Sequence, residues 1–179
     1  MLKKWIKDLT YIIENRAANA GLLYRIARRY YTNVIEKEAI LANITSADHV
    51  LCIGGGMCPF TAILLHQVTG AKVTVIDNNM LCIPKAVQVT ERLDISESVQ
   101  VICKDGGCPE LDYSQYSVVH LALQVSPMEQ VFSHVAGHVR PGTRLLMRRS
   151  KKLSGGTLSC RPYITHKSRN IGSTLLYTA

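Results

Sequence analysis

Three short segments of the sequence end in residues that can hold a nucleoside. The run "VLCIGGG" passes from apolar residues into Gly54, Gly55 and Gly56, while "VTVID" and "VICKD" end at Asp77 and Asp105. Glycines let the backbone turn sharply and let a ligand approach it closely. A carboxylate after the second run can bind both hydroxyls of a ribose, and a side chain after the third can meet an adenine edge. The spacing therefore predicts a nucleoside-containing ligand.

The glycine turn differs from that of a dinucleotide-binding protein. Such turns read G-x-G-x-x-G and place a helix N-terminus against a pyrophosphate, whereas Pro59 stands at the third glycine position here. S-adenosylmethionine has no pyrophosphate, so we predict it as the cofactor, with a ligand-free glycine turn as the alternative. The predicted cofactor-binding residues are Gly54, Gly55, Gly56, Met57, Thr61, Asp77, Asn78, Asp105, Gly106 and Gln124.

Alternating strands and helices must position these residues. The runs "HVLCI", "KVTVID", "VQVICKD", "SVVHLALQ" and "TRLLMRR" are typical of buried strands, and residues 59–68, 80–92 and 128–139 are typical of helices. This order predicts an α/β fold with a doubly wound, mainly parallel, Rossmann-like sheet. Runs at 159–165 and 173–178 predict an antiparallel edge. We expect residues 1–45 to form a short N-terminal helical cap and residues 46–179 one compact cofactor-binding domain.

Net charge changes sign along the chain. Residues 1–40 hold eight Lys/Arg and four Asp/Glu, residues 41–139 hold four and nine, and residues 140–179 hold nine and none. Such a tail can contact nucleic acid phosphates, a small acidic substrate or an acidic partner. Only Tyr163 and Tyr177 could stack on bases there. We predict a small acidic or amine-containing substrate, with nucleic acid bound at most nonspecifically.

Composition and cysteine usage are typical of a cytoplasmic protein. The apolar runs fall far short of the ~20 residues that span a bilayer, and charges interrupt the apolar positions of the N-terminus. The six cysteines form no C-x-x-C pair, so we expect reduced, mostly buried thiols, with Cys52 and Cys103 inside strands. The pair His134 and His138 fits a wet helix edge better than a metal site. We therefore predict no metal.

The turn carries a family resemblance. Residues 50–77 resemble motif I and the acidic strand end of class I S-adenosylmethionine-dependent methyltransferases, with Gly54, Gly56 and Thr61 in common. The form "IGGGMCPFTAI" is more similar to the I-G-S-G-P-x-P-L-T-S-I run of nicotianamine synthases, and "HVRPGTRLLMRRS" resembles their M-x-P-G-A-x-L-x-x-R-S strand. The resemblance covers about residues 30–150. It implies the class I methyltransferase fold and, from the second family, transfer of an aminocarboxypropyl group.

The reaction type is left open by these motifs. The sulfonium has three electrophilic carbons, and the placement of the nucleophile selects one of them. We predict methyl transfer to a small molecule, with S-adenosylhomocysteine as product. Nicotianamine synthase-like aminocarboxypropyl transfer is the first alternative; RNA methylation and non-catalytic cofactor binding are further ones.

Residues on the substrate side are expected on the helix that precedes the glycine turn. A carboxylate near the sulfonium could take the proton of an attacking amine, so the catalytic candidates are Glu38, Tyr31 and Tyr30. The alternative is a helix on which Tyr30 packs and Glu38 faces solvent. The basic run at 148–152 is read as a solvated face that could also meet an anionic substrate. The amphipathic N-terminal helices predict a possible homodimer.

Overall fold

The computed structural model describes residues 31–151, 163–167 and 171–179. Tyr30, Cys160 and the predicted helices within residues 1–30 lie outside the described residues, as does the dimer predicted from those helices.

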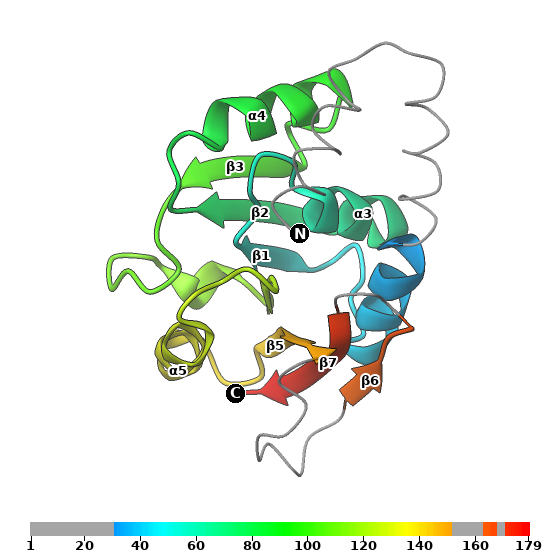
Figure 1. Ribbon diagram of the computed structural model, residues 1–179, viewed down its shortest axis with the longest axis vertical. Coiled ribbons are helices and arrows are strands. Elements are labelled where there is room, and N and C mark those ends of the chain that lie inside the picture. The colour runs from blue at the N-terminus through cyan, green and yellow to red at the C-terminus, as the bar shows by residue number, and fades with distance from the viewer. Residues whose placement is uncertain (1–30, 152–162, 168–170) are drawn as a thin grey trace.

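One seven-stranded sheet organises the described chain (Figure 1). Its strands lie in the order β3-β2-β1-β4-β5-β7-β6. The first five are parallel, and β7 pairs antiparallel with both β5 and β6. The strand bounds are β1 His49–Ile53, β2 Lys72–Asp77, β3 Val99–Cys103, β4 Val118–Leu121, β5 Arg144–Ser150, β6 Tyr163–Thr165 and β7 Ile171–Thr178.

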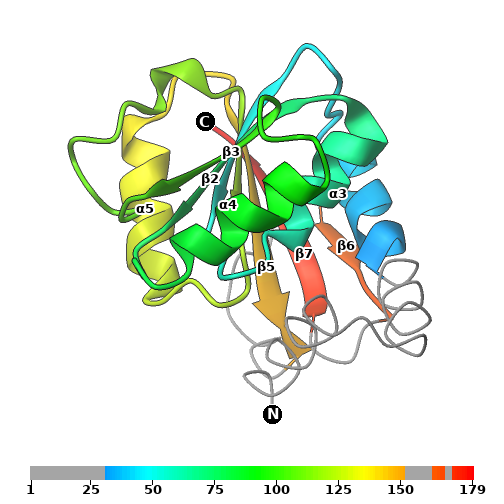
Figure 2. The same ribbon diagram turned by 90° about the horizontal axis from the view of Figure 1, so that it is seen from above.

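Helices cover both faces of the sheet, as Figure 2 shows. The helix at residues 31–41 and α3 (Phe60–Thr69) lie on one face, while α5 (Met128–His138) lies on the other. Helix α4 (Ile83–Arg92) packs beside the edge strand β3, and a short 3₁₀ helix (Tyr113–Gln115) precedes β4. The predicted doubly wound, mainly parallel sheet with an antiparallel edge is confirmed.

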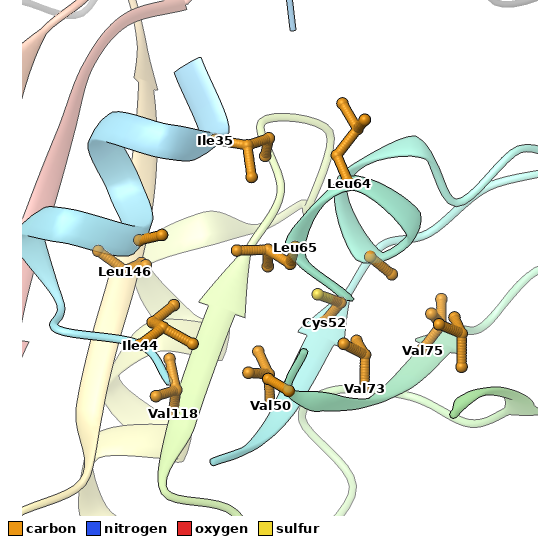
Figure 3. Packing of buried hydrophobic residues seen from close by; sticks show 14 of the residues in the cluster. Ile35, Ile44, Val50, Cys52, Leu64, Leu65, Val73, Val75, Val118 and Leu146 are labelled. Atoms are coloured by element: carbon orange, nitrogen blue, oxygen red, sulfur yellow. The ribbon is translucent and has the colours of Figure 1, made fainter. Parts of the chain in front are cut away.

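Two apolar cores flank the sheet because successive residues of a strand point to opposite faces. On the first face Val50, Val73, Val118 and Leu146 pack against Ile35 and the buried residues of α3 (Figure 3). On the second face Leu51, Val119 and Leu145 pack with Val135 of α5. The inner strands β1, β2, β4 and β5 are thus buried on both sides, which explains their continuous apolar sequence, whereas the edge strand β3 is partly exposed.

The helix at residues 31–41 presents a buried stripe to the first core. Val34, Ile35 and Ala39 are buried at the spacing of one helical face, and Ala42, directly after the helix, is buried as well. Glu38 lies in the middle of this stripe and is 0% exposed. The alternative in which Glu38 faces solvent is therefore wrong.

Several local expectations need correction. Arg148 lies inside β5 and is buried, because alternation along the strand turns its side chain to the helix-covered face; it is not part of a solvated basic run. Cys103 is exposed, since it ends the edge strand β3. Residues 80–82 precede α4 instead of belonging to it. None of the helices in the described ranges has the length and apolar character needed to cross a bilayer.

Candidate active site

The strand order reverses between β1 and β4, and a cavity opens there. From β1 the chain proceeds to β2 and β3 on one side, and then to β4 and β5 on the other. Ligands of open parallel sheets bind at such a switch point, beyond the carboxyl ends of the strands. The cavity holds about 580 Å³ and is lined by residues following β1, β2, β3 and β4, together with Arg148 of β5. This volume is within the range of small-ligand sites.

The glycine turn closes one wall of the cavity. A Cβ on Gly55 would lie 2.2 Å from Cγ1 of Val75, so β2 leaves no room for a side chain at this position. Gly56 has φ +61°, a conformation that residues with a side chain rarely adopt. Its N–H donates to Oδ2 of Asp77 at 2.7 Å, which ties the turn to the end of β2. The turn is therefore fixed in shape before any ligand binds.

The two acidic strand ends lie beside the turn. Asp77 also accepts a hydrogen bond from the Asn79 N–H at 2.9 Å. Asp105 accepts from Asn78 Nδ2 at 3.3 Å and from the Gly107 N–H at 2.7 Å. All ten predicted cofactor residues line the one cavity. The structure thus brings them together, and their contacts with the cofactor remain a prediction. We call this part of the cavity the cofactor end.

Buried polar side chains gather beside the cavity at β4, β5 and β7, on the other side of β1 from Asp77 and Asp105, and we call this part the inner end. Arg148 donates to the Glu38 carboxylate from Nε at 2.8 Å and from Nη2 at 2.7 Å. His120 Nε2 lies 3.2 Å from Oε2 of Glu38, and Thr174 donates to Oε1 at 2.6 Å. His166 Nε2 lies 2.8 Å from the Thr174 hydroxyl. Glu38 therefore holds together residues from four distant segments.

The sheet register explains how this cluster forms. Cys52 of β1 pairs with His120 of β4, and Arg148 of β5 pairs with Thr174 of β7. The side chains of these residues point to the same face of the sheet as the first core, nearer the carboxyl ends of the parallel strands. The helix at residues 31–41 covers that face. His120 and Arg148 line the cavity, whereas Glu38 lies behind them. Arg148 also donates to the Thr61 hydroxyl at 2.9 Å.

The charge state of the cluster follows from burial and from Arg148. Burial alone would raise the pKa of Glu38, but the Arg148 charge and the hydrogen bonds to the carboxylate hold that pKa well below its ordinary value. Burial and Arg148 lower the pKa of His120, against the opposing effect of Glu38. His120 is therefore neutral at pH 7, and Arg148 is the cation that keeps Glu38 ionised. The Glu38–Arg148 pair is a buried ion pair without net charge.

Tyr31 and Glu38 occupy different positions relative to the cavity. Tyr31 lines it and packs edge-on against Phe60, with the ring centroids 5.4 Å apart. Glu38 is displaced from the lining, and its two oxygens already face four donors. Of the two described catalytic candidates, Tyr31 therefore lines the cavity, whereas Glu38 contacts residues that line it.

Four polar residues of the inner end were absent from the predicted site. They are His120, Arg148, His166 and Thr174. One signal was present in the sequence: Glu38 shares the helical spacing of Val34, Ile35 and Ala39, and an acid on an apolar stripe requires a buried partner. The identity of that partner depends on strand register, which the sequence alone does not determine.

The described cysteines and histidines form no metal site. No group of three or more possible metal ligands occurs among residues 31–151, 163–167 and 171–179. Cys58 and Cys82 line the cavity, whereas Cys108 does not. His134 and His138 stack on each other at 4.2 Å on α5. All five cysteines in the described ranges are free thiols, and burial raises the pKa of Cys52 and Cys58 to about 12.

Solved structures resemble this fold closely. MtNAS in complex with S-adenosylmethionine superposes with a TM-score of 0.77 at 22% identity, covering 97% of this chain and 71% of MtNAS. MtNAS with MTA and tNA gives a TM-score of 0.76 at 22% identity, covering 97% and 69%. An RNA methyltransferase from Salinibacter ruber, bound to S-adenosyl-L-homocysteine, gives 0.67 at 18% identity, covering 82% and 90%. These likenesses establish the class I methyltransferase-like fold.

The sequence itself identifies the family. No curated protein matches the chain as a significant relative. Residues 29–161 match the family described as nicotianamine synthase protein. This span includes the glycine turn, both acidic strand ends, and Glu38, His120 and Arg148. The chain belongs to the nicotianamine synthase family, and the prediction that it is an S-adenosylmethionine-dependent transferase is confirmed.

Proposed function

We propose that this protein transfers the aminocarboxypropyl group of S-adenosylmethionine to the amine of a small substrate. The observation that carries the proposal is the single cavity, which joins the cofactor end to a buried ionic cluster. A cofactor whose adenosine lies at Asp77 and Asp105 would extend its sulfonium along the glycine turn toward the inner end. The acceptor would then approach from the side of Tyr31, His120 and Arg148.

Aminocarboxypropyl transfer has more support than the methyl transfer first expected. The glycine turn is more similar to that of nicotianamine synthases than to motif I of the methyltransferases, and the family match extends over most of the chain. The structure of MtNAS with MTA and tNA belongs to the same set of similar folds. Both reactions need the same cofactor site, and they differ in which carbon of the sulfonium faces the nucleophile.

Arg148 provides a place for an acidic group of the acceptor. A guanidinium has five N–H donors, and three of them bond Glu38 and Thr61. Arg148 also lines the cavity, and a carboxylate is the acceptor that matches the paired donors of a guanidinium. We therefore propose an acceptor that carries both an amine and a carboxylate. This agrees with the small acidic or amine-containing substrate predicted from the sequence.

Methyl transfer is the second candidate. It is favoured by the likeness to the Salinibacter ruber RNA methyltransferase, of which this fold covers 90%. The described residues offer little for base stacking, because Tyr163 on the edge strand β6 is the one large exposed aromatic residue among them. An RNA substrate therefore has less support than a small one.

The co-product separates the two reactions. The protein is incubated with S-adenosylmethionine and a mixture of the twenty common amino acids, and the nucleosides are resolved by chromatography and mass spectrometry. Aminocarboxypropyl transfer releases methylthioadenosine at a rate above that of a protein-free control. Formation of S-adenosylhomocysteine in its place would establish methyl transfer and overturn the proposal.

A further inference from the structure

The loop at residues 104–112, between β3 and the 3₁₀ helix, forms part of the wall of the cofactor end. Its first three residues, Lys104, Asp105 and Gly106, line the cavity. The loop sequence KDGGCPELD contains two glycines and a proline, and it forms neither helix nor strand. Glycines leave a segment with much conformational freedom of its own. Contacts with the rest of the fold must therefore fix where the Asp105 carboxylate lies.

Gly106 is the point at which this loop contacts the core. A Cβ on Gly106 would lie 2.4 Å from Cγ2 of Ile53, so the loop backbone lies directly against the end of β1. The Gly106 carbonyl accepts a buried hydrogen bond from the Tyr113 hydroxyl at 2.7 Å. The hydrogen bond from Asn78 to Asp105 is longer, at 3.3 Å, and exposed. Tyr113 therefore supplies the short, buried hydrogen bond that holds Gly106 in place.

The Tyr113 hydroxyl is itself fixed by the second core. Tyr113 is 2% exposed and packs in that core with Leu111 and Val135. Its ring meets the ring of His134 on α5 edge-on, with the centroids 6.0 Å apart. Burial raises the pKa of Tyr113 to about 12, so the hydroxyl keeps its proton and donates at neutral pH. The hydroxyl is thus a donor whose position does not depend on the loop.

A single peptide group connects Tyr113 to the Asp105 carboxylate. The Gly106 carbonyl and the Gly107 N–H belong to the same planar peptide group. Tyr113 bonds its carbonyl, and its N–H donates to Oδ1 of Asp105 at 2.7 Å. Rotation of this peptide group would break both hydrogen bonds. The orientation of the Asp105 carboxylate therefore depends on the Tyr113 hydroxyl, although the two side chains are eight residues apart in sequence.

We propose that Tyr113 is a positioning residue for the cofactor, which holds the Asp105 carboxylate, through the Gly106–Gly107 peptide group, where it accepts a hydrogen bond from the adenine amino group. This inference rests on the placement of adenosine at Asp77 and Asp105 in the proposed function, and it holds for transfer of either group. A hydroxyl that only stabilised the core would change the free energy of unfolding without changing which ligand is preferred.

The first test removes the hydroxyl and keeps the ring. In Tyr113→Phe the Gly106 carbonyl loses its donor, and we expect the Kd for S-adenosylhomocysteine, measured by calorimetric titration, to rise by about 5–20-fold. Tyr116→Phe is the matched control. Tyr116 is 4% exposed in the same core and its hydroxyl bonds Thr74, but neither residue lines the cavity. The control should lower the melting temperature comparably and leave Kd within about twofold.

A second ligand separates positioning from general loosening of the site. S-inosylhomocysteine has a carbonyl oxygen in place of the adenine amino group, so at that position it offers Asp105 no donor. Wild-type protein should bind it more weakly than S-adenosylhomocysteine, and Tyr113→Phe should change its Kd by less than about twofold. An equal rise in Kd for both ligands, or an unchanged Kd for S-adenosylhomocysteine, would overturn the proposal.

A measurement on wild-type protein covers the case in which Tyr113→Phe does not fold. Proton NMR should show a protected hydroxyl proton, assigned to Tyr113 through its contacts with the ring protons. Saturation with S-adenosylhomocysteine should slow its exchange with water by at least about threefold, because the ligand holds the loop. Exchange that the ligand leaves unchanged would overturn the proposal. If wild-type protein does not bind the ligand, the cofactor placement fails as well; if it binds and Tyr113→Phe binds equally, only the role of Tyr113 fails.

Discussion

The cofactor end and the inner end of the cavity are built in opposite ways. The cofactor end consists of backbone and of partly exposed carboxylates, and its residues follow the ends of β1, β2, β3 and β4. The inner end consists of buried side chains drawn from residues as far apart as Glu38 and Thr174. Steric limits on the glycines fix the shape of the cofactor end, whereas the ion pair between Glu38 and Arg148 holds the inner end together.

This difference has an energetic consequence. A change at the cofactor end alters the shape of a turn that water already reaches. A change at the inner end leaves a charge buried without its partner, and the penalty for that is several kcal/mol. Stability should therefore depend mainly on the inner end, and cofactor affinity mainly on the cofactor end.

The largest effect is expected at Glu38. Substitution Glu38→Ala leaves Arg148 buried without a counter-ion, and we expect the free energy of unfolding to fall by about 3–5 kcal/mol. Urea denaturation followed by circular dichroism measures the loss. Glu36→Ala is the matched control, because Glu36 is exposed on the same helix, and it should change stability by less than about 0.5 kcal/mol. Equal effects of the two substitutions would contradict the assigned role of the ion pair.

A smaller effect is expected at the glycine turn. In Gly55→Ala the new Cβ would lie 2.2 Å from Cγ1 of Val75, and such overpacking costs about 1–3 kcal/mol. The turn must also move, so the affinity for S-adenosylhomocysteine should fall at least about tenfold, a loss of about 1.4 kcal/mol. Adding Val75→Ala should recover part of both losses.

The control for this prediction is a glycine in open space. A Cβ on Gly137 of α5 would meet no heavy atom within 4 Å, and alanine is the better helix former. Gly137→Ala should therefore leave affinity unchanged and stability equal or slightly higher. If Val75→Ala recovers neither the stability nor the affinity lost in Gly55→Ala, crowding against Val75 is not the cause of those losses.

The smallest effect is expected from mild acid. Burial lowers the pKa of His49, His120 and His166 below the ordinary value of 6.5. The unfolded chain then binds protons more readily than the folded one, so stability is complete above about pH 6.5 and decreases as pH falls through the lowered values. Protonation of Glu38 adds a further loss below the ordinary value of 4.5.

A histidine variant tests the sign of this dependence. In His166→Gln the side-chain amide can still donate to Thr174 but does not titrate, so the decrease in stability between about pH 7 and pH 5 should be shallower. Stability that rises toward pH 5 in wild-type protein would contradict the lowered pKa values.

The cofactor end could be predicted from sequence because its features are local. Gly54 to Gly56, Asp77 and Asp105 each end an apolar strand, and parallel strands bring such ends to one edge. The inner end could not be predicted in the same way. The partners of Glu38 are up to 136 residues away, and they are set by the register of β4, β5 and β7. Alternation along the run TRLLMRR predicts that one of Arg148 and Arg149 faces the sheet's helix-covered side, but it does not identify Glu38 as the buried partner.

Calorimetric titration with S-adenosylhomocysteine tests the central claim most directly, that one cavity holds the cofactor at one end and borders the buried ionic cluster at the other. Wild-type protein should bind the ligand. Asp77→Asn should weaken binding by about 10–100-fold, through loss of a charged hydrogen bond worth about 1.5–3 kcal/mol. His120→Gln should leave Kd within about threefold. Absence of binding to wild-type protein, or an equal loss in both variants, would contradict the account.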